Sequence, residues 1–369
     1  MNPSCARNLL NCTKRRSHLA ASLQRASKGL ASARTSTSLH TQNPGVAAHL
    51  QGPSFRRATQ ISLSRSPNHR FSTSARKMAP ADLVEPPLPT PVNTAGDLVE
   101  AAKRAAGRKA VEDYLSHDYR YVGIGSGSTI KYVVEAIADL PREVTAKMKF
   151  VPTGSQSREL IREAKLTVLA IDDLVLEFNE RVPGQQYLDV CFDGADEVDP
   201  ELNCIKGGGA CHYQEKLVAK FSKQFVCVAD YRKEVPNLLT SWVGIPIEVQ
   251  PLATEAVRRE LLLLGSKKPF VRSGLPGKAG AIVTDNGNNV IDAPFPPLLL
   301  NSQVDQMDPS RGLWTVDALA QRIKSITGVL EVGVFSGLTG PQALQQGMGG
   351  EKPVKVYFGM QDGSVKTLG

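Results

Sequence analysis

Three carboxylates stand within five residues at positions 193–197, where the sequence reads DGADE. An apolar run that ends at Phe192 comes directly before them, so the acids follow the carboxyl end of an expected strand. Carboxylates this close repel one another unless water, hydrogen bonds or a cation offsets their charge. A polar turn accounts for one such acid and leaves two unexplained. The segment is therefore a candidate for binding a ligand or a cation.

A second candidate is Lys206, which stands directly before the three glycines at 207–209. Consecutive glycines cost chain entropy and are usually kept where the backbone approaches a ligand or takes a positive φ. A glycine hinge would explain the glycines but not the lysine. The helix expected next carries Glu215 and Lys216, which taken alone would be read as surface charges. Their functional interpretation depends on the three segments occurring together.

Two turns rich in glycine and hydroxyl groups precede expected helices, GIGSGST at 123–129 and TGSQS at 153–157. Ser128 stands where a dinucleotide-binding loop has its third glycine, which weakens that interpretation. A single phosphate suits the first turn better, because backbone N–H groups, hydroxyls and the positive end of a helix dipole would surround it. An N-capped helix after a tight turn is the alternative. Two such turns at one sheet edge favour an anion site.

Histidine is scarce after residue 77, where only His117 and His212 occur. Acid–base work would then fall to carboxylates and lysines, whose pKa values burial and neighbouring charge can move toward neutrality. With so few histidines and no zinc-type cysteine spacing, we expect no metal. The four cysteines after residue 77 lie in or beside apolar runs, which is typical of buried thiols in a reducing compartment.

The elements that must position these residues alternate between strands and helices. Helical patterns run from Asp97 to Leu115 and from Ile130 to Leu140, and strand patterns lie at 121–124, 149–151, 167–171, 187–192 and 225–229. This alternation predicts an α/β fold with a doubly wound, mostly parallel sheet. Ligands collect beyond the carboxyl ends of the strands in such sheets, where the candidate segments fall.

The pattern changes from residue 246. Short strand patterns at 247–249, 270–272, 281–284 and 290–291 flank helical patterns at 254–264 and 315–326. They predict a smaller α+β domain at 246–328, inserted after a first domain at 97–245. Strand patterns at 329–335, 354–358 and 364–368 close the chain, and we expect the segment 329–369 to return to the first sheet.

The net charge of +8 comes from an N-terminal extension and not from the body. Residues 1–77 hold thirteen Lys and Arg, nineteen Ser and Thr, and no Asp or Glu, so we expect them to be disordered. The remaining 292 residues hold 31 basic and 36 acidic side chains. Five prolines at 78–96 predict a stiff linker.

Nucleic-acid and membrane partners are not expected. The basic extension offers only Phe55 and Phe71 for stacking on bases. No apolar run approaches the roughly 20 residues that span a bilayer.

Two interpretations of the extension stay open. Its Arg-rich, acid-free composition is typical of an organelle transit peptide, and the segment 70–74 looks like the end of a mitochondrial presequence. The alternative is that the mature chain starts near Met78 and the protein is cytoplasmic.

From Asp97 to Gly369 the chain strongly resembles the type A ribose-5-phosphate isomerases, on six motifs in the family's order. They are GIGSGST at 123–129, DGADEVD at 193–199, IKGGGA at 205–210, QEK at 214–216, VADYRK at 228–233 and TDNGNNVID at 284–292. Each motif alone is weak, and the six together in one order are specific.

The resemblance implies an enzyme that interconverts D-ribose 5-phosphate and D-ribulose 5-phosphate in the non-oxidative pentose phosphate pathway, without a metal or organic cofactor. It also implies a Rossmann-like catalytic domain, an inserted domain that takes part in oligomer contacts, and a homodimer or homotetramer. The general base of the family falls on Glu215. The family's substrate contacts fall on Ser126, Gly127, Ser128, Thr129, Asp193, Gly194, Ala195, Asp196, Lys206, Gly207, Gly208, Gly209 and Lys233.

Aldose–ketose isomerisation moves a proton between C2 and C1 through an enediolate and needs a group that stabilises the negative oxygen. We expect Glu215 to carry the proton, and Lys206 with the N–H groups of 207–209 to stabilise the charge. Asp193 and Asp196 would bind sugar hydroxyls and assist ring opening. Lys233 would bind the phosphate with a hydroxyl-rich loop, although the loop at 126–129 could instead face the sugar end.

The chain departs from the family's pattern in a few places. Ser126 stands where many members have Thr, which keeps the hydroxyl. Tyr231 and Arg232 replace small residues common before Lys233. The segments 274–280 and 294–311 look longer than in compact bacterial members.

Two other classes of function compete with the isomerase. A non-catalytic sugar-phosphate sensor would not require the pair Lys206 and Glu215. An NAD-dependent dehydrogenase is disfavoured by Ser128, which replaces the third glycine of the dinucleotide loop.

Overall fold

The computed structural model describes residues 95–178 and 183–369. The predicted disorder of 1–77 and almost all of the predicted linker at 78–96 lie outside the described residues. The first described helix, α2 (Ala95–Tyr114), begins two residues inside that linker.

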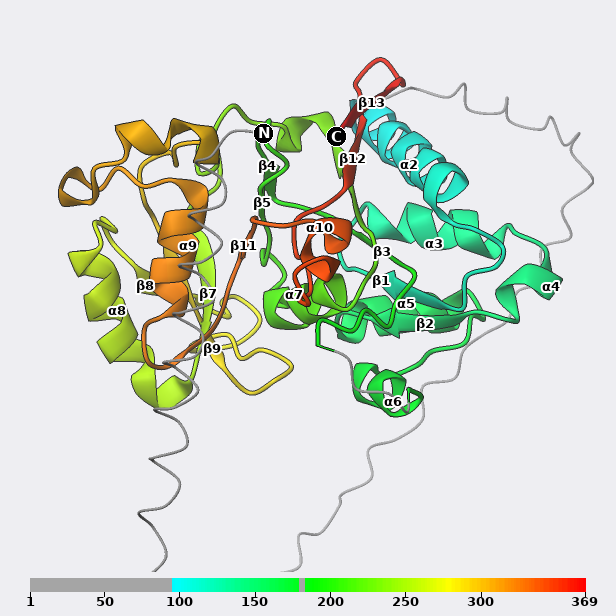
Figure 1. The fold of residues 1–369 in the computed structure, drawn as a ribbon, viewed down its shortest axis with the longest axis horizontal. Coiled ribbons are helices and arrows are strands. Elements are labelled where there is room, and N and C mark those ends of the chain that lie inside the picture. Colours follow the sequence, from blue (N-terminus) through cyan, green and yellow to red (C-terminus); the bar gives the residue numbers. More distant parts are fainter. Residues whose placement is uncertain (1–94, 179–182) are drawn as a thin grey trace, which may run out of the picture. The chain divides into compact units, whose positions relative to one another are not determined.

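A six-stranded sheet forms the first domain, with the strand order β13-β12-β6-β3-β1-β2 (Figure 1). Strands β12, β6, β3, β1 and β2 run parallel, and β13 pairs antiparallel to β12. The bounds are β1 Tyr121–Ile124, β2 Lys149–Pro152, β3 Val190–Asp193, β6 Phe225–Asp230, β12 Lys355–Gly359 and β13 Val365–Leu368. The mostly parallel α/β sheet predicted from the sequence is confirmed.

Helices cover both faces of this sheet because each presents an apolar stripe to it. On one face, Ala106 of α2 and Ile130 of α3 pack into a core with Val226 of β6. On the other face, Val218 of α7 packs with Cys191 of β3. Besides α2, the helices are α3 Ile130–Ala138, α4 Arg142–Thr145, α5 Ser155–Glu163, α6 Ile171–Leu176, α7 His212–Lys220 and α10 Gly340–Leu344. No helix among the described residues is long and apolar enough to cross a membrane.

The inserted domain is a four-stranded antiparallel sheet, ordered β10-β7-β9-β8, with two helices packed on it. Val257 and Leu319 of these helices share a core with Ile247 of the sheet. The bounds are β7 Ile245–Val249, α8 Thr254–Leu263, β8 Phe270–Val271, β9 Asn289–Ala293, α9 Val316–Lys324 and β10 Val329–Val332. Short 3-10 turns lie at Tyr231–Lys233, Pro251–Ala253, Asn301–Gln306 and Pro309–Arg311.

The predicted return of 329–335 to the first sheet is wrong. The run divides at Gly333 into β10, which pairs with β7, and β11 (Val334–Phe335), which pairs with β5. Gly333 donates its N–H to the carbonyl of Pro246 at 2.7 Å and accepts the N–H of Lys206 at 2.8 Å, so the chain changes sheets there. The inserted sheet therefore includes residues 329–332, beyond the predicted boundary at 328, whereas β12 and β13 do join the first sheet.

Two other predicted strands are absent as strands and form only isolated β-bridges. In the run 167–171 only Val168 pairs, with Phe150, and helix α6 starts at Ile171. The run 281–284 makes isolated bridges at Ala281 and Val283. Apolar runs this short carry no information on which partner strand is within reach.

A small three-stranded sheet, ordered β11-β5-β4, was not predicted. Strand β4 (Glu197–Val198) belongs to the acidic segment, and β5 (Cys204–Ile205) directly precedes Lys206. They pair antiparallel, and Asp196 donates its N–H to the carbonyl of Ile205 at 2.7 Å. This hairpin holds the acidic segment and the lysine–triglycine segment next to each other.

Candidate active site

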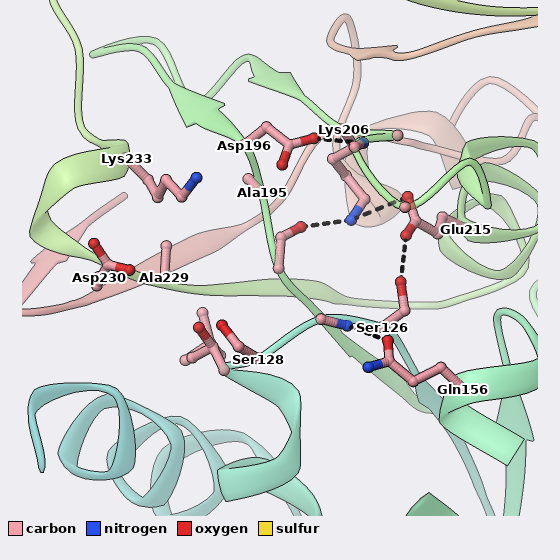
Figure 2. Close-up of a pocket in the computed structure, with 17 residues that line it drawn as sticks. Ser126, Ser128, Gln156, Ala195, Asp196, Lys206, Glu215, Ala229, Asp230 and Lys233 are labelled. Atoms are coloured by element: carbon pink, nitrogen blue, oxygen red, sulfur yellow. Dashed lines mark hydrogen bonds and ion pairs between the residues drawn. The ribbon is translucent and has the colours of Figure 1, made fainter. Parts of the chain in front are cut away.

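A cavity of about 180 Å³ opens where β1, β3 and β6 end, and the predicted segments meet there (Figure 2). All predicted site residues except Asp193 line it. The complete lining is Ser126, Gly127, Ser128, Thr129, Gln156, Gly194, Ala195, Asp196, Lys206, Gly207, Gly208, Gly209, Glu215, Val228, Ala229, Asp230 and Lys233. The carboxyl edge of the parallel sheet is thus the candidate active site, as its topology predicts.

A buried cluster of three charges lies at one end of this cavity. The ammonium of Lys206 is 2.9 Å from Asp193 Oδ2 and 3.4 Å from Glu215 Oε2, and it also donates to the carbonyl of Gly194. Each of the three charged residues is at most 4% exposed. Charges removed from water to this degree persist only when they are paired. Lys206 therefore holds the two carboxylates together, and Asp193 lies behind it instead of lining the cavity.

The cluster changes the proton affinities of Asp193 and Lys206. Burial raises the pKa of Asp193 above its ordinary value, against the opposing effect of the Lys206 ammonium. Burial would lower the pKa of Lys206, but the carboxylates of Asp193 and Glu215 outweigh it and raise that pKa well above its usual range. Lys206 therefore stays a cation at every physiological pH.

Asp193 is fixed by backbone groups. Its Oδ1 accepts the N–H of Gly194 at 2.7 Å and the N–H of Ser126 at 3.1 Å. A Cβ at Gly125 would lie 1.9 Å from the same oxygen, so only glycine fits there. The first glycine loop thus folds around the carboxylate that follows β3.

Glu215 reaches the cavity from the first turn of α7. Its Oε1 accepts the hydroxyl of Ser126 at 2.8 Å. On the next residue of the same loop, Gly127 donates its N–H to Oε1 of Gln156 at 3.0 Å (Figure 2). Gln156 belongs to the second predicted turn, TGSQS, but was not predicted as a site residue. Only its pairing across the loop shows that it lines the cavity.

Asp196 lies on the cavity wall above the triglycine loop. Its Oδ2 accepts the N–H of Gly208 at 2.8 Å. Burial raises the pKa of Asp196, although that hydrogen bond and the cations Lys206 and Lys233 lower it. A carboxyl group with a raised pKa, next to the cavity, is suited to exchanging a proton with a ligand hydroxyl.

The third acid of the segment, Glu197, has a structural task. It is fully buried and accepts the backbone N–H groups of Leu239, Ser241 and Trp242 at 2.5, 2.6 and 2.8 Å. The loop it holds carries the Trp242 ring, whose centroid is 5.4 Å from the ammonium of Lys233. The three acids therefore have three different environments, which relieves the repulsion expected among them.

The opposite end of the cavity has cations with fewer partners. Lys233 comes from the 3-10 turn after β6, and Figure 2 shows it across the cavity from Lys206 and Glu215. Lys103 of α2, which is 6% exposed, donates to the hydroxyl of Ser128 at 3.0 Å and pairs with Glu100 Oε1 at 2.8 Å. Thr129 precedes α3 and its side chain makes no capping hydrogen bond there. Ammonium groups, hydroxyls and a helix N-terminus together favour an anion.

Sequence reasoning missed Lys103, although a signal was present. Within the helical pattern expected from Asp97 to Leu115, Val99, Ala102 and Ala106 recur at helical spacing, and Lys103 falls on the same helical face. A lysine on an apolar face must extend its ammonium to a partner or to a site.

Lys216 is not the surface charge that its residue type suggested. It is 3% exposed and donates to the carbonyls of Val332 at 2.7 Å and Val334 at 2.6 Å. It also pairs with Glu331 at 3.2 Å. Consecutive residues of α7 thus point in different directions, Glu215 into the cavity and Lys216 onto the strands around Gly333.

The TDNGNNVID motif joins the inserted domain to the cavity walls. Glu248 of β7 is buried and accepts from Thr284, Asn286 and Asn288, which fixes the loop. The loop then reaches the first domain, where Ser155 donates its N–H to Asp285 Oδ2 at 3.1 Å. The motif therefore positions the start of α5 and does not line the cavity.

Metal ligands do not gather anywhere in the described ranges 95–178 and 183–369: no group of three or more His, Cys, Asp or Glu could hold an ion. The carboxylates of the acidic segment instead pair with Lys206 or accept hydrogen bonds from backbone N–H groups.

The sheet is mostly parallel, and the cavity at its edge has a buried lysine–carboxylate cluster at one end and the ammonium of Lys233 at the other. These features define an α/β enzyme for a small anionic substrate. The sequence profile of the family "Ribose 5-phosphate isomerase A (phosphoriboisomerase A)" matches residues 149–346. A ribose-5-phosphate isomerase of Mycosarcoma maydis is 46% identical over 268 residues, which are 72% of this chain and 80% of that protein.

Two solved structures agree with these sequence matches. The ribose 5-phosphate isomerase A of Methanocaldococcus jannaschii is 31% identical, with a TM-score of 0.56, over 73% of this chain and 98% of its own. A D-ribose-5-phosphate isomerase in complex with phospho-erythronic acid is 30% identical, with a TM-score of 0.56, over the same shares. The chain belongs to the ribose 5-phosphate isomerase A family.

Proposed function

We propose that this protein interconverts D-ribose 5-phosphate and D-ribulose 5-phosphate by proton transfer between C2 and C1. The observation that carries the proposal is the buried Glu215 carboxylate, held 2.8 Å from the Ser126 hydroxyl and 3.4 Å from the Lys206 ammonium on the cavity wall. A fixed, buried carboxylate is the type of base that this reaction needs. The relatives named for this activity support the assignment.

Glu215 carries the proton in both directions. From the open-chain aldose it removes the C2 proton, and the electrons of the C–H bond form the C1–C2 double bond while those of the carbonyl move to O1. The protonated Glu215 then returns the proton to C1, the enediolate electrons form the carbonyl at C2, and the O2 proton passes to O1. Holding the base and the carbon in place removes much of the entropic barrier.

Lys206 and the triglycine loop stabilise the enediolate. The ammonium of Lys206 remains protonated because two carboxylates raise its pKa. A permanent cation and fixed N–H groups in a water-poor cavity stabilise an oxyanion more than water does, since they need no reorganisation as the charge develops. Asp196, with its raised pKa, binds the ring hydroxyls and assists ring opening.

The phosphate binds at the end of the cavity where Lys233 lies. Lys233 is one partner, and Ser128 and Thr129 at the start of α3 are the others. Lys103 supports them through its hydrogen bond to Ser128. The first glycine loop thus contributes to both ends of the cavity, because Ser126 bonds to Glu215 and Ser128 accepts a hydrogen bond from Lys103.

The test is an isomerase assay of the folded chain and of Glu215→Gln. The variant keeps the shape and the Ser126 hydrogen bond but cannot accept a proton, so we expect kcat to fall about 1,000-fold. Solvent deuterium should enter the product of the wild type, as an enediolate requires. Lys220→Gln is the matched control, since Lys220 lies on the same helix but pairs with Glu351 away from the cavity. Activity of Glu215→Gln within a few-fold of wild type would refute the assignment.

We propose further that the protein acts in the pentose phosphate pathway as a homo-oligomer. The inserted domain carries Leu252 and Leu263, which are 93% and 80% exposed and would be covered by a second copy. Sedimentation measures the oligomeric state.

For the compartment we propose a cytoplasmic chain that starts near Met78, with mitochondrial import through residues 1–77 as the alternative. N-terminal sequencing of the native protein distinguishes the two.

A further inference from the structure

We propose that Arg272, a residue of the inserted domain, positions the triglycine loop so that its N–H groups face the enediolate. This inference deepens the proposed function and rests on it. Arg272 directly follows β8, outside the six family motifs, and does not line the cavity. It acts through the loop and is a positioning residue.

One guanidinium nitrogen of Arg272 bonds to two consecutive carbonyls of the loop. Nη1 donates to the oxygen of Gly207 at 2.8 Å and to the oxygen of Gly208 at 3.0 Å. These carbonyls belong to the peptides whose N–H groups come from Gly208 and Gly209. In a trans peptide the C=O and the N–H point in opposite directions. Holding both oxygens on the side of Arg272 therefore turns both N–H groups to the other side.

That other side is the cavity. The N–H of Gly208 meets Asp196 Oδ2, and both residues line the cavity. The N–H of Gly209 has no partner within the described part of the chain, and Gly209 also lines the cavity. The loop thus offers one N–H engaged by a substrate-facing carboxylate and one free for an oxyanion.

The guanidinium is itself anchored. Nε and Nη2 bond to the two carboxylate oxygens of Asp292 on β9, at 2.7 and 2.5 Å. The side chains of Arg272 and Asp292 are 15% and 4% exposed. Bidentate pairs of this kind are geometrically rigid, and a cation on the carbonyl side of a peptide polarises its N–H into a stronger donor. A lysine could not make the same contacts, because its ammonium lacks the planar set of N–H donors by which a guanidinium bonds to a carboxylate and to two carbonyls at once.

The loop is held from below as well. Gly207 has φ of +106°, and a Cβ there would lie 2.7 Å from Nδ1 of the buried His212. The loop is therefore restrained by contacts with both His212 and the guanidinium of Arg272. Its conformation is set before substrate arrives, and one of the two restraints comes from the inserted domain.

The experiment compares Arg272→Lys and Asp292→Asn with wild type, using kcat, KM and the affinity for phospho-erythronic acid. The carboxylate of this acid shares its negative charge over two oxygens, so it serves as a stable mimic of the enediolate. For Arg272→Lys we expect kcat to fall about 30-fold, KM to change less than threefold, and the affinity for phospho-erythronic acid to fall in parallel with kcat. Asp292→Asn keeps the guanidinium but weakens its anchor, so a smaller loss of the same kind is expected.

Glu201→Gln is the matched control. Glu201 of the first domain accepts the N–H groups of Asn301 and Ser302 of the inserted domain, away from the cavity. It should lower the melting temperature and leave kcat and the inhibitor affinity unchanged. If Arg272 only joined the domains, Arg272→Lys would behave in the same way, and this would overturn the proposal. Should Arg272→Lys fail to fold, a folded Asp292→Asn with wild-type kcat and inhibitor affinity overturns it equally.

The two proposals can fail separately. A wild type that does not isomerise ribose 5-phosphate refutes the proposed function. Inhibitor affinity, measured by calorimetry without turnover, still decides whether Arg272 positions the loop.

Discussion

The two ends of the cavity differ in how their charges are paired. At the end of Glu215, the charges of Asp193, Lys206 and Glu215 are buried and paired with one another. At the other end, the ammonium of Lys233 contacts the ring of Trp242. The first end is complete without a ligand, and the second gains a charge partner when an anion binds.

Under the proposed function, this difference separates two tasks that need different physical properties. Proton transfer needs groups whose positions and proton affinities are fixed before the substrate arrives, and mutual pairing in a buried cluster provides this. Binding a doubly charged phosphate needs cations whose charge is still available. A change at the paired end should therefore alter kcat, and a change at the open end should alter KM.

After Glu215→Gln, the largest effect is expected from Asp193→Asn at the paired end. The amide still accepts the backbone N–H groups of Ser126 and Gly194, but it no longer shares the Lys206 ammonium. Lys206 then pairs with Glu215 alone, so two carboxylates no longer fix the positions of the cation and the base. We expect kcat to fall about 300-fold with KM nearly constant, as measured by steady-state kinetics. A rise in KM at unchanged kcat would contradict the division between the two ends.

An intermediate effect is expected from Lys233→Met at the open end. The methionine keeps the contact with Trp242 but removes the charge. KM for ribose 5-phosphate should rise about 30-fold with kcat within threefold, because a charge-assisted phosphate contact is lost. The KM of the wild type should also depend more on salt than that of the variant. Equal salt dependence in both proteins would show that Lys233 does not bind the phosphate.

The smallest effect is on the free energy of unfolding, through His212, which contacts the triglycine loop. Burial, with the cations Lys216 and Arg272 nearby, lowers the pKa of His212 to about 3. Between this value and the ordinary pKa near 6.5, the unfolded state binds the proton and the folded state does not, so the free energy of unfolding decreases as pH falls. Asp193 acts in the opposite sense, because its folded pKa is raised and the folded state binds its proton first.

Comparison of wild type with His212→Leu isolates the histidine from Asp193. The stability difference between the two proteins should shift against the wild type by about 1 kcal/mol on going from pH 6 to pH 5. Chemical denaturation at both pH values measures it. A difference that does not change with pH would show that His212 is protonated in the folded protein.

Much of the first domain follows from local patterns, because each buried strand and each helix carries its own periodicity. The run before Asp193 and the glycine loop at 123–129 were placed correctly at strand ends. The division of 329–335 at Gly333 was not predictable, since the two halves pair with β7 and β5, which are far away in sequence. Pairing over such distances depends on the whole fold and not on the run itself.

In the candidate site, too, contacts between residues distant in the sequence could not be predicted. Residue types in the motifs indicated the carboxylates, Lys206 and the glycines, and the structure brings them to one cavity. Gln156 and Arg272 could not be found in this way, because their contacts are with backbone groups of remote loops. Backbone atoms are the same at every residue, so the sequence holds no sign of which ones a side chain will reach.

The first glycine loop also sets a fixed spacing between two of its hydroxyl groups. The hydroxyl of Ser126 touches the base, and that of Ser128, two residues later, touches the cation of α2. If the phosphate binds at Ser128, as proposed above, the number of carbons between the phosphate and the acidic C–H bond decides which carbon lies next to Glu215. A sugar phosphate longer or shorter by one carbon misplaces that bond by about 1 Å, an error that can cost about 100-fold in rate. Under the proposed binding mode, the spacing of Ser126 and Ser128 would therefore select substrates by the length of their carbon chain.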